Sequence, residues 1–183
     1  MFKRISVINR SMSFLIVVFI VSFVLSATTY GAVFNVTNPT EFQDALNTAA
    51  SNSGNDTINV AAGNYAITAT LTYNAAQNDT LSIIGTGAGS TILDGGSSVQ
   101  ILNINTTGLA SDDLADISIS GISIKNGHSS TGEGGGLYIR TNHAKITIQN
   151  SGFSDNTAAT WWSGGGAYVV SNYDTVTLSN NTR

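Results

Sequence analysis

The most closely spaced acidic residues are Asp112, Asp113 and Asp116, which precede an apolar strand pattern. Three clustered carboxylates supply oxygen ligands of the kind that Ca²⁺ prefers, but a calcium site needs about 6 to 8 converging oxygens. A solvated turn in which Asp116 pairs with Lys145 accounts for the same residues. We therefore assign no metal ligand and no cofactor, and Ca²⁺ is the one ion that this cluster suggests.

The other residues with reactive side chains are scattered. The two histidines, His128 and His143, have no cysteine, histidine or acid at metal-ligand spacing. Lys125 and Arg140 have the chemistry of a base or a charge neutraliser in a lyase, but no carboxylate pair or metal set accompanies them. The glycine-rich run from Gly85 to Gly89 lacks the following helix that a phosphate loop needs, so it predicts a turn. We assign no catalytic residue.

Trp161 and Trp162 are the candidate ligand-binding residues. The pair lies in a loop between two strand patterns. Exposed tryptophans stack on sugar rings or anchor a protein partner, whereas packed tryptophans cover the flank of a fold. Both alternatives stay open, and the binding alternative gives the pair a surface glycan or protein as its partner.

A repeat must position all of these residues. The stretch from Ile117 to Ile139 is an imperfect copy of the stretch from Ile146 to Val169. Equivalent residues lie 29 positions apart before the tryptophan loop and 30 apart after it: Ile117 and Ile146, Ile119 and Ile148, Ile124 and Phe153, Tyr138 and Tyr168. Val176 and Leu178 begin a third copy. A fixed period in this range is typical of arrays whose units bury their apolar faces by stacking.

Within each copy the apolar residues alternate with polar ones, as at Ile117, Ile119, Leu137 and Ile139. This is the period of strands and not of helices. Like strands recur in the same order about one repeat apart, so they can stack in parallel without two-residue hairpins. The pattern therefore predicts an all-β fold, a parallel β-helix.

Short motifs in the two copies resemble a known repeat. Gly134–Tyr138 (GGGLY) and Gly164–Tyr168 (GGGAY) are similar to the GGA-I/L-Y signature of the polymorphic outer membrane protein repeat, and Phe153–Asn156 (FSDN) is similar to its FxxN signature. In the first copy Gly127 stands where that Asn is expected. From about Val33 onward the chain resembles a right-handed parallel β-helix of the pectin-lyase-like class.

The resemblance implies two kinds of function. Polymorphic outer membrane proteins are surface proteins, whereas enzymes of the pectin-lyase-like class cut acidic polysaccharides. The chain has no Asn-Thr-Asp, Gly-Asp-Asp, Gly-His-Gly or Arg-Ile-Lys motif of the kind found in polygalacturonases. The resemblance therefore favours a non-catalytic surface module.

The first 32 residues are predicted to be a secretory signal peptide. Met1 to Arg10 carries three basic residues, and Phe14 to Leu25 is a nearly continuous apolar run. This run is too short to span a membrane, which takes about 20 residues. Small residues follow, and we expect cleavage after Ala27, Gly31 or Ala32.

The remaining domain, residues 33–183, is acidic. It retains four basic residues against eleven acidic ones, a net charge of −7. A chain of this charge lacks the basic surface that nucleic acid or anionic lipid requires. Only 10 % of the residues are charged, so uncharged polar ladders must cover the surface, and without cysteine no disulfide supports the fold.

The domain is expected to begin with a strand, Val33 to Val36, and an amphipathic helix from Glu41 to about Ala50. Thr40 and Gln43 match a capping box at the start of this helix. One face of the helix is apolar: Phe42, Ala45, Leu46 and Ala49. We expect this helix to cover the open end of the coil, where terminal strands leave unpaired backbone groups.

The repeat register also predicts which side chains stack in neighbouring coils, at the strand spacing of about 4.8 Å. The pairs are Tyr138 over Tyr168, Asn142 over Asn172, Asn126 over Asp155, and Asp116 over Lys145. Stacked amides hydrogen-bond along a coil. Asp116 and Lys145 would form an exposed ion pair worth at most about 1 kcal/mol.

These observations favour a secreted module at the extracellular or outer-membrane surface, an adhesin-like passenger or stalk that binds a glycan or a protein. The alternative is a polysaccharide lyase or glycoside hydrolase of the pectin-lyase-like class, because fold alone does not determine function. The third copy breaks off at Arg183, so we expect further coils or an anchor downstream. We also expect the uncovered strands of the last coil to favour end-to-end association.

Overall fold

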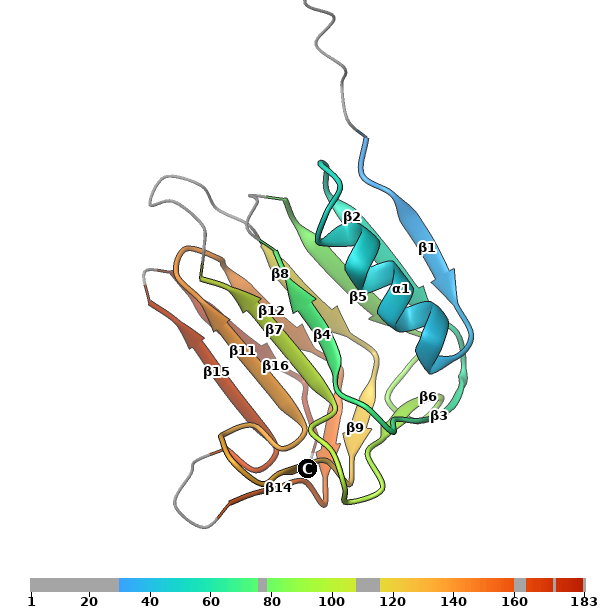
Figure 1. The fold of residues 1–183 in the computed structure, drawn as a ribbon, viewed down its shortest axis with the longest axis vertical. Helices are drawn as coiled ribbons and strands as arrows, with labels where there is room; N and C mark the ends of the chain where they lie inside the picture. The colour runs from blue at the N-terminus through green and yellow to red at the C-terminus, as the bar shows by residue number, and fades with distance from the viewer. Residues whose placement is uncertain (1–29, 76–78, 108–115, 160–163, 173, 183) are drawn as a thin grey trace, which may run out of the picture.

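A computed structural model of the chain describes residues 30–75, 79–107, 116–159, 164–172 and 174–182. Within them the regular structure is nearly all strand, with one helix at the N-terminal side (Figure 1). The strands pair in parallel throughout three main sheets, and each sheet takes one strand from each turn of the chain. The predicted all-β class and parallel stacking are therefore confirmed.

The sheets are named A, B, C and D. In the order of pairing, sheet A contains β1 (Val33–Val36), β2 (Asp56–Val60), β5 (Leu81–Gly85), β8 (Ile117–Ser120), β12 (Ile146–Gln149) and β16 (Val176–Ser179). Sheet B contains β3 (Gly63–Ala66), β6 (Thr91–Asp94), β9 (Ser123–Lys125) and β13 (Gly152–Ser154). Sheet C contains β4 (Leu71–Asn74), β7 (Leu102–Thr106), β11 (Leu137–Thr141) and β15 (Ala167–Ser171). The small sheet D pairs β10 (His128–Ser129) with β14 (Thr157–Ala158).

Each circuit of the chain passes through sheets A, B and C in turn, so successive circuits form stacked coils, the arrangement of a solenoid. The register between coils is the one that the repeat predicts. Ile117 pairs with Ile146 in sheet A, Ile124 with Phe153 in sheet B, and Tyr138 with Tyr168 in sheet C. The repeat therefore determines both the strands and their partners.

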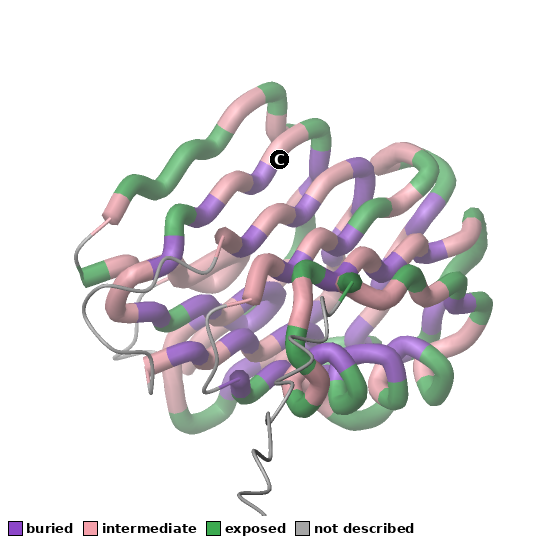
Figure 2. Tube along the Cα trace, turned by 90° about the horizontal axis from the view of Figure 1, so that it is seen from above, coloured by how far each residue is buried: buried purple, intermediate pink, exposed green. Residues whose placement is uncertain are grey.

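The apolar residues that alternate along each strand form the interior of the stack. Buried and less buried positions alternate along the coils (Figure 2). Ile119, Leu137 and Ile148 come from different sheets or coils, and each is completely buried. Burying such a side chain contributes about 1.5 to 3 kcal/mol, which explains how stacking stabilises units that have no core of their own.

The corners between sheets use a left-handed backbone conformation. After sheet A the corner residues are Gly121, Asn150 and Asn180, with φ of 66°, 51° and 52°. After sheet B the equivalent residues Asn126 and Asp155 have φ of 53° and 54°. Glycine, asparagine and aspartate adopt this conformation at least cost, so the residue type at each corner follows from the bend. Asn126 and Asp155 therefore occupy equivalent corner positions on neighbouring coils, as the repeat register predicts.

The predicted N-terminal helix is present as α1 (Pro39–Ala49), but the predicted cap is wrong. Asn38, and not Thr40, is the N-cap, and its side-chain oxygen accepts the Glu41 N–H at 3.0 Å. Proline is favoured at the first helical position because it has no N–H to leave unpaired. It also holds the preceding residue extended, and Asn38 has φ −148°. Pro39 therefore starts the helix two residues earlier than the Thr40–Gln43 box implies.

Helix α1 packs against β1, β2 and β4 and so covers the N-terminal end of the stack, as predicted (Figure 1). Phe42, Ala45, Leu46 and Ala49 form its buried face. Gln43 has a different role from the predicted cap. Its side-chain amide accepts the Thr72 N–H at 2.8 Å and donates to the Thr72 carbonyl at 3.0 Å. Because Thr72 lies on β4, the edge strand of sheet C, this amide substitutes for a neighbouring strand.

Candidate functional site

The outer face of sheet C carries a pair of stacked aromatic rings. In β11 the inward positions are Leu137 and Ile139, so strand alternation turns Tyr138 and Arg140 outward. Tyr168 pairs with Tyr138 on the next coil, and their ring centroids are 5.6 Å apart at an interplanar angle of 12°. The predicted tyrosine stack is therefore confirmed. Each ring is half-buried and keeps one face turned away from its partner.

Beside these rings lies a groove of about 420 Å³. Its lining residues are Glu133, Tyr138, Arg140, Tyr168, Val170 and Asn172. Register places Arg140 beside Val170, just as it places Tyr138 beside Tyr168. The lining therefore comes from two neighbouring coils, and it extends along the strands from Glu133, before β11, to Asn172, after β15.

The groove contains one cation and one anion, Arg140 and Glu133. Among the described residues, the ion pair joins Lys125 and Asp94, which lie outside the groove. Within the same residues, neither Arg140 nor Glu133 has an oppositely charged group within 4 Å. Gln100 positions the segment that carries Glu133, because its side chain donates to the Glu133 carbonyl at 3.0 Å. A guanidinium supplies several N–H donors and a carboxylate supplies acceptors. The groove therefore offers both kinds of hydrogen-bonding group.

An amide ladder borders the groove. Asn172 donates from its side chain to the Asn142 side-chain oxygen at 2.8 Å, and Asn142 donates to the Thr107 carbonyl at 2.7 Å. The predicted stack of Asn142 and Asn172 is confirmed. This ladder uses one of the two N–H donors of the Asn172 side-chain amide, so Asn172 adds both donor and acceptor capacity to the lining of the groove.

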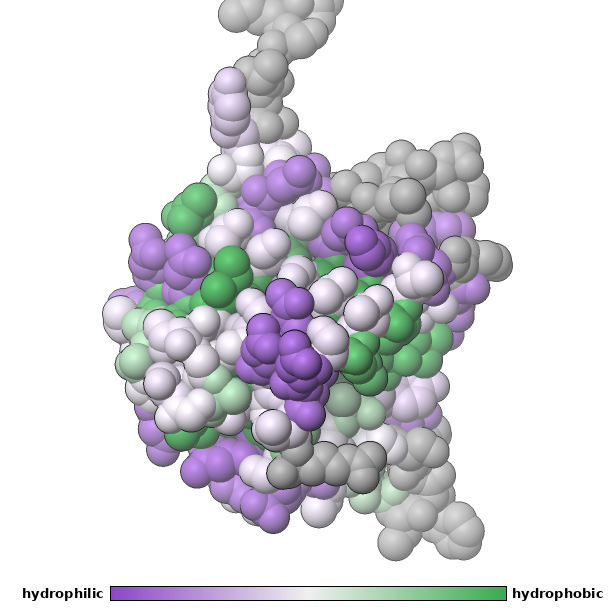
Figure 3. All heavy atoms as spheres, turned by 180° about the vertical axis from the view of Figure 1, so that it is seen from behind, coloured by the Kyte–Doolittle hydropathy of each residue, from purple (hydrophilic) through white to green (hydrophobic). Residues whose placement is uncertain are grey.

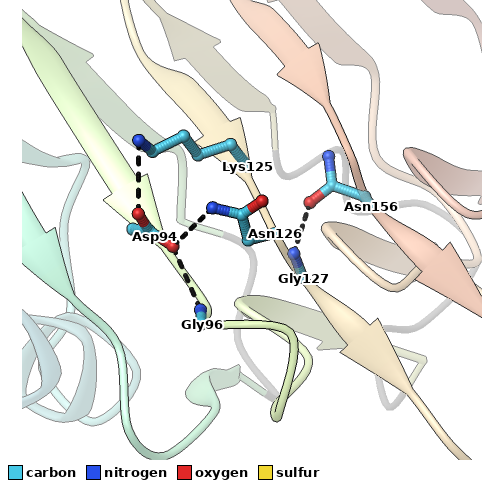
Figure 4. A network of polar contacts seen from close by, with 6 residues as sticks. All are labelled: Asp94, Gly96, Lys125, Asn126, Gly127 and Asn156. Carbon is cyan, nitrogen blue, oxygen red and sulfur yellow. Dashed lines mark hydrogen bonds and ion pairs between the residues drawn. The ribbon is translucent and has the colours of Figure 1, made fainter.

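Lys125 belongs to a separate network at the corner of sheets B and C (Figure 4). Its ammonium lies 3.2 Å from the Asp94 carboxylate on the preceding coil. The Asn126 amide donates to the same carboxylate at 2.9 Å, and the Gly96 N–H donates at 3.0 Å. The hydrogen bond from Asn126 is the largest cause of a lowered Asp94 pKa, and Gly96 and Lys125 lower it further. The network pairs Lys125 with an opposite charge on the preceding coil and places it outside the lining of the sheet C groove.

Asn156, the asparagine of the FxxN motif, joins two coils at the same corner (Figure 4). Its side-chain oxygen accepts the Gly127 N–H at 2.7 Å, and its amide donates to the Ile124 carbonyl at 2.8 Å. Both backbone partners are buried and lie on the preceding coil. Asn156 therefore has a structural role: it satisfies two backbone groups that the bend leaves without strand partners.

Asn181 makes the same two contacts one coil later, at the corner of sheets A and B. It accepts the Ser151 N–H at 2.9 Å and donates to the Ile148 carbonyl at 2.9 Å. The two asparagines lie at different corners of the coil. An asparagine therefore joins neighbouring coils in the same way at the corner after sheet A and at the corner after sheet B. Residues of this kind stabilise the stack rather than bind a ligand.

The other candidates from the sequence have varied outcomes. Trp161, Trp162, Asp112 and Asp113 lie outside the described residues. Asp116 and Lys145 occupy the predicted adjacent coils, since the Ile117 N–H donates to the Lys145 carbonyl, but the predicted ion pair between them is not formed. In the described part of the chain, no three His, Cys, Asp or Glu side chains gather as a metal site would require.

His128 contacts the Thr157 hydroxyl at 2.9 Å across the small sheet D, so it serves as a polar contact between coils. The run from Gly85 to Gly89 forms a turn that leads directly into β6, as predicted, and no helix follows it. These residues contribute to the corners of the stack and lie outside the groove lining.

A larger opening of about 680 Å³ lies at the C-terminal end of the stack. Its walls include Ile148, Phe153, Ala167 and Leu178, which belong to the interior of the last coils. The view from behind shows a hydrophobic patch on the side of these coils (Figure 3), and Leu178 is 63 % exposed. This opening is the interior of the stack seen at its end, whereas the sheet C groove brings charged, aromatic and amide groups together.

Sequence reasoning placed Tyr138 and Tyr168 correctly, but it named Arg140 only as a base or charge neutraliser and did not join the three residues into a site. The signal was present, because Tyr138 and Arg140 lie two positions apart on one strand and so share a face. Glu133 and Asn172 come from loops on neighbouring coils. No signal in the local sequence connects these two residues to the same groove.

None of the helices within the described ranges combines the length and the apolar character needed to cross a membrane. Comparison with protein-family models, with curated proteins and with solved structures finds no match. What defines the class of this protein is therefore its own geometry, a solenoid of parallel strands with a polar and aromatic groove along one side.

Proposed function

We propose that this chain is an exported right-handed parallel β-helix module that acts at the cell surface by binding a partner through the outer face of sheet C. The observation that carries the proposal is the groove beside Tyr138 and Tyr168, where stacked rings meet Arg140 and Glu133, neither of which forms an ion pair with another described residue. Aromatic residues and arginine are enriched at binding surfaces.

Three further features support this proposal. The leader sequence favours export. Parallel crossover connections are almost always right-handed, which favours that hand for the coil. The repeat motifs resemble those of polymorphic outer membrane proteins, and Asn156 of the FxxN motif joins neighbouring coils. A rigid stack of this kind presents a fixed surface, which reduces the ordering cost of binding.

The test is a binding screen of the mature chain, residues 33–183, against immobilised glycans and extracellular proteins, with and without Ca²⁺. We expect capture of a partner, and we expect the double variant Tyr138→Ala/Tyr168→Ala to lose it. Thr147→Ala is the matched control, because Thr147 lies on sheet A and outside the groove.

A second variant, Trp161→Ala/Trp162→Ala, separates the tryptophan loop from the groove. Loss of capture in this variant alone would move the site away from sheet C. Polysaccharide degradation is measured in the same samples. Cleavage of a polysaccharide by the mature chain would overturn the non-catalytic proposal in favour of the lyase or hydrolase alternative.

A further inference from the structure

One carboxylate is buried at the N-terminal end of the stack. Asp56, the first residue of β2, is 2 % exposed, and it is the only charged side chain in the interior formed by the described residues. The ion pair that these residues form joins Lys125 and Asp94, so Asp56 has no described cation within 4 Å. Burial of a charge is costly unless an opposite charge and hydrogen bonds compensate it. The described side chains supply no such cation to Asp56.

The shorter of the two hydrogen bonds to the Asp56 side chain comes from a backbone nitrogen. The carboxylate oxygen Oδ1 accepts the Ala32 N–H at 2.7 Å and the Asn52 side-chain amide at 3.1 Å. Ala32 is held there by its own carbonyl, which accepts the Thr57 N–H at 2.9 Å where β1 begins to pair with β2 (Figure 1). This bond fixes Ala32 without help from the residues that precede it.

The Ala32 nitrogen is also at a position where the sequence predicts a cut, and this step rests on the export that is part of the proposed function. The leader fits cleavage after Ala27, Gly31 or Ala32. Ala27 lies outside the described residues, and a cut there leaves the Ala32 nitrogen as a neutral amide. A cut after Ala32 removes this nitrogen from the mature chain. Only a cut after Gly31 converts it into an α-amino group.

Hydrolysis of the Gly31–Ala32 peptide bond adds one water, which leaves the carboxylate on Gly31 and the protonated amino group on Ala32. The peptidase that removes leaders in the exporting cell supplies this step. In the folded chain Gly31 packs so closely that a Cβ added to it would clash with the Asn55 backbone. The cut therefore precedes folding, and the loss of Gly31 opens space beside Asn55 for water or for the additional N–H donors of an ammonium.

A charged amino group at this place supplies the cation that Asp56 otherwise lacks. An α-amino group is mostly protonated at pH 7, and a hydrogen bond between charged groups is about twice as strong as one between neutral groups. We infer that the mature chain begins at Ala32 and that its α-ammonium forms an ion pair with the buried Asp56 carboxylate. Removal of the leader thereby strengthens the attachment of β1, the edge strand of sheet A.

The first test is the N-terminus of the exported protein. The full chain, residues 1–183, is expressed in a bacterial host that exports proteins, and the exported product is analysed by intact mass and N-terminal sequencing. We expect it to start at Ala32. A start at Thr28 or Val33 would overturn the inference while the proposed export stands. A chain that keeps its leader would overturn both.

The second test isolates the charge. The chain of residues 32–183 is compared with the same chain acetylated at its α-amino group, because the acetyl group keeps the Ala32 N–H and replaces the Gly31 carbonyl but removes the charge. We expect acetylation to raise the equilibrium constant for unfolding in urea roughly ten- to a hundredfold, the range for hydrogen bonds to charged groups. Equal stability of the free and acetylated chains would overturn the inference.

Two variants assign the effect to Asp56. Asp56→Asn should remove the sensitivity to acetylation, whereas the matched control Asp44→Asn, which removes an exposed carboxylate from α1, should keep it. An acetylation effect that persists in full in Asp56→Asn would contradict the ion pair. If Asp56→Asn does not fold, the comparison of the free and acetylated chains decides.

Discussion

Substitution of Asn156 tests whether a single amide at the corner joins two coils of the stack. Asn156→Ala removes the acceptor for the Gly127 N–H and the donor to the Ile124 carbonyl, at 2.7 and 2.8 Å. Both groups are on buried residues of the preceding coil. The truncated side chain leaves them without a partner unless the corner opens to water.

The expected size follows from these two bonds. A hydrogen bond contributes about 0.5 to 1.5 kcal/mol net, and a buried group left unpaired costs about 1 to 3 kcal/mol. Two such groups give a loss of about 2 to 6 kcal/mol in the free energy of unfolding. Asn156→Asp keeps only the acceptor and places a carboxylate beside a carbonyl, so we expect it to lose at least as much.

The assay is urea unfolding of the mature chain, followed by circular dichroism and by amide hydrogen exchange at Gly127. We expect a lower midpoint and faster exchange of the Gly127 N–H. Asn59→Ala is the matched control, because Asn59 also donates an amide hydrogen bond to the preceding coil, to Asn35 at 3.1 Å, but at an exposed position. Its loss should stay below about 1 kcal/mol.

The reasoning is refuted if Asn156→Ala and Asn59→Ala shift the midpoint equally while exchange at Gly127 is unchanged. Asn181→Ala offers an internal comparison, since it removes the same pair of bonds at 2.9 Å each. Its bonds lie nearer the open end of the stack, so we expect a smaller loss than at Asn156.

Three further predictions concern the end, a corner and the charge network of the stack. Gln43→Ala leaves the N–H and C=O of Thr72 without their amide partner, and we expect a loss of about 1 to 3 kcal/mol by urea unfolding and more self-association by light scattering. Gly121→Ala places a Cβ at φ +66° and 2.7 Å from the Gly85 carbonyl oxygen, so thermal unfolding should show a clear decrease in midpoint temperature, whereas Gly89→Ala, with nothing within 4 Å and no left-handed backbone, changes it less. Hydrogen bonds lower the pKa of Asp94 below its usual 3.8. The contribution of Asp94 to the free energy of unfolding is therefore present above pH 3.8 and is lost as the pH falls through the lowered pKa. Asp94→Asn should remove this part of the acid dependence, and acid unfolding curves identical to those of the unmodified chain would contradict the prediction.

The sequence by itself determined the repeat and therefore the coil-to-coil register. Residues 29 or 30 positions apart became strand neighbours, as with Tyr138 and Tyr168 or Asn142 and Asn172. This worked because a stacked fold turns sequence period directly into spatial contact. Strand alternation likewise gave the buried face, because Ile117, Ile119, Ile146 and Ile148 are all inside.

Other features depended on geometry that the period does not contain. Lys125 was assigned no partner, and the stack pairs it with Asp94 from an early coil whose sequence has diverged too far to show its register. The helix cap was misplaced for a local reason, since Pro39 was treated only as a strand breaker although proline is favoured as the first residue of a helix.

Only the tertiary structure shows which side chains line the groove and which backbone groups the coil-joining asparagines bind. Asn156 is polar and part of a loop in the sequence, but its partners are the backbone groups of Ile124 and Gly127, which only the bend of the preceding coil exposes. Glu133 precedes β11 and Asn172 follows β15, and both residues line the same groove because these two strands pair side by side. Sequence period specifies which strands stack, whereas the paths of the corners and loops, which vary between copies, specify which side chains meet.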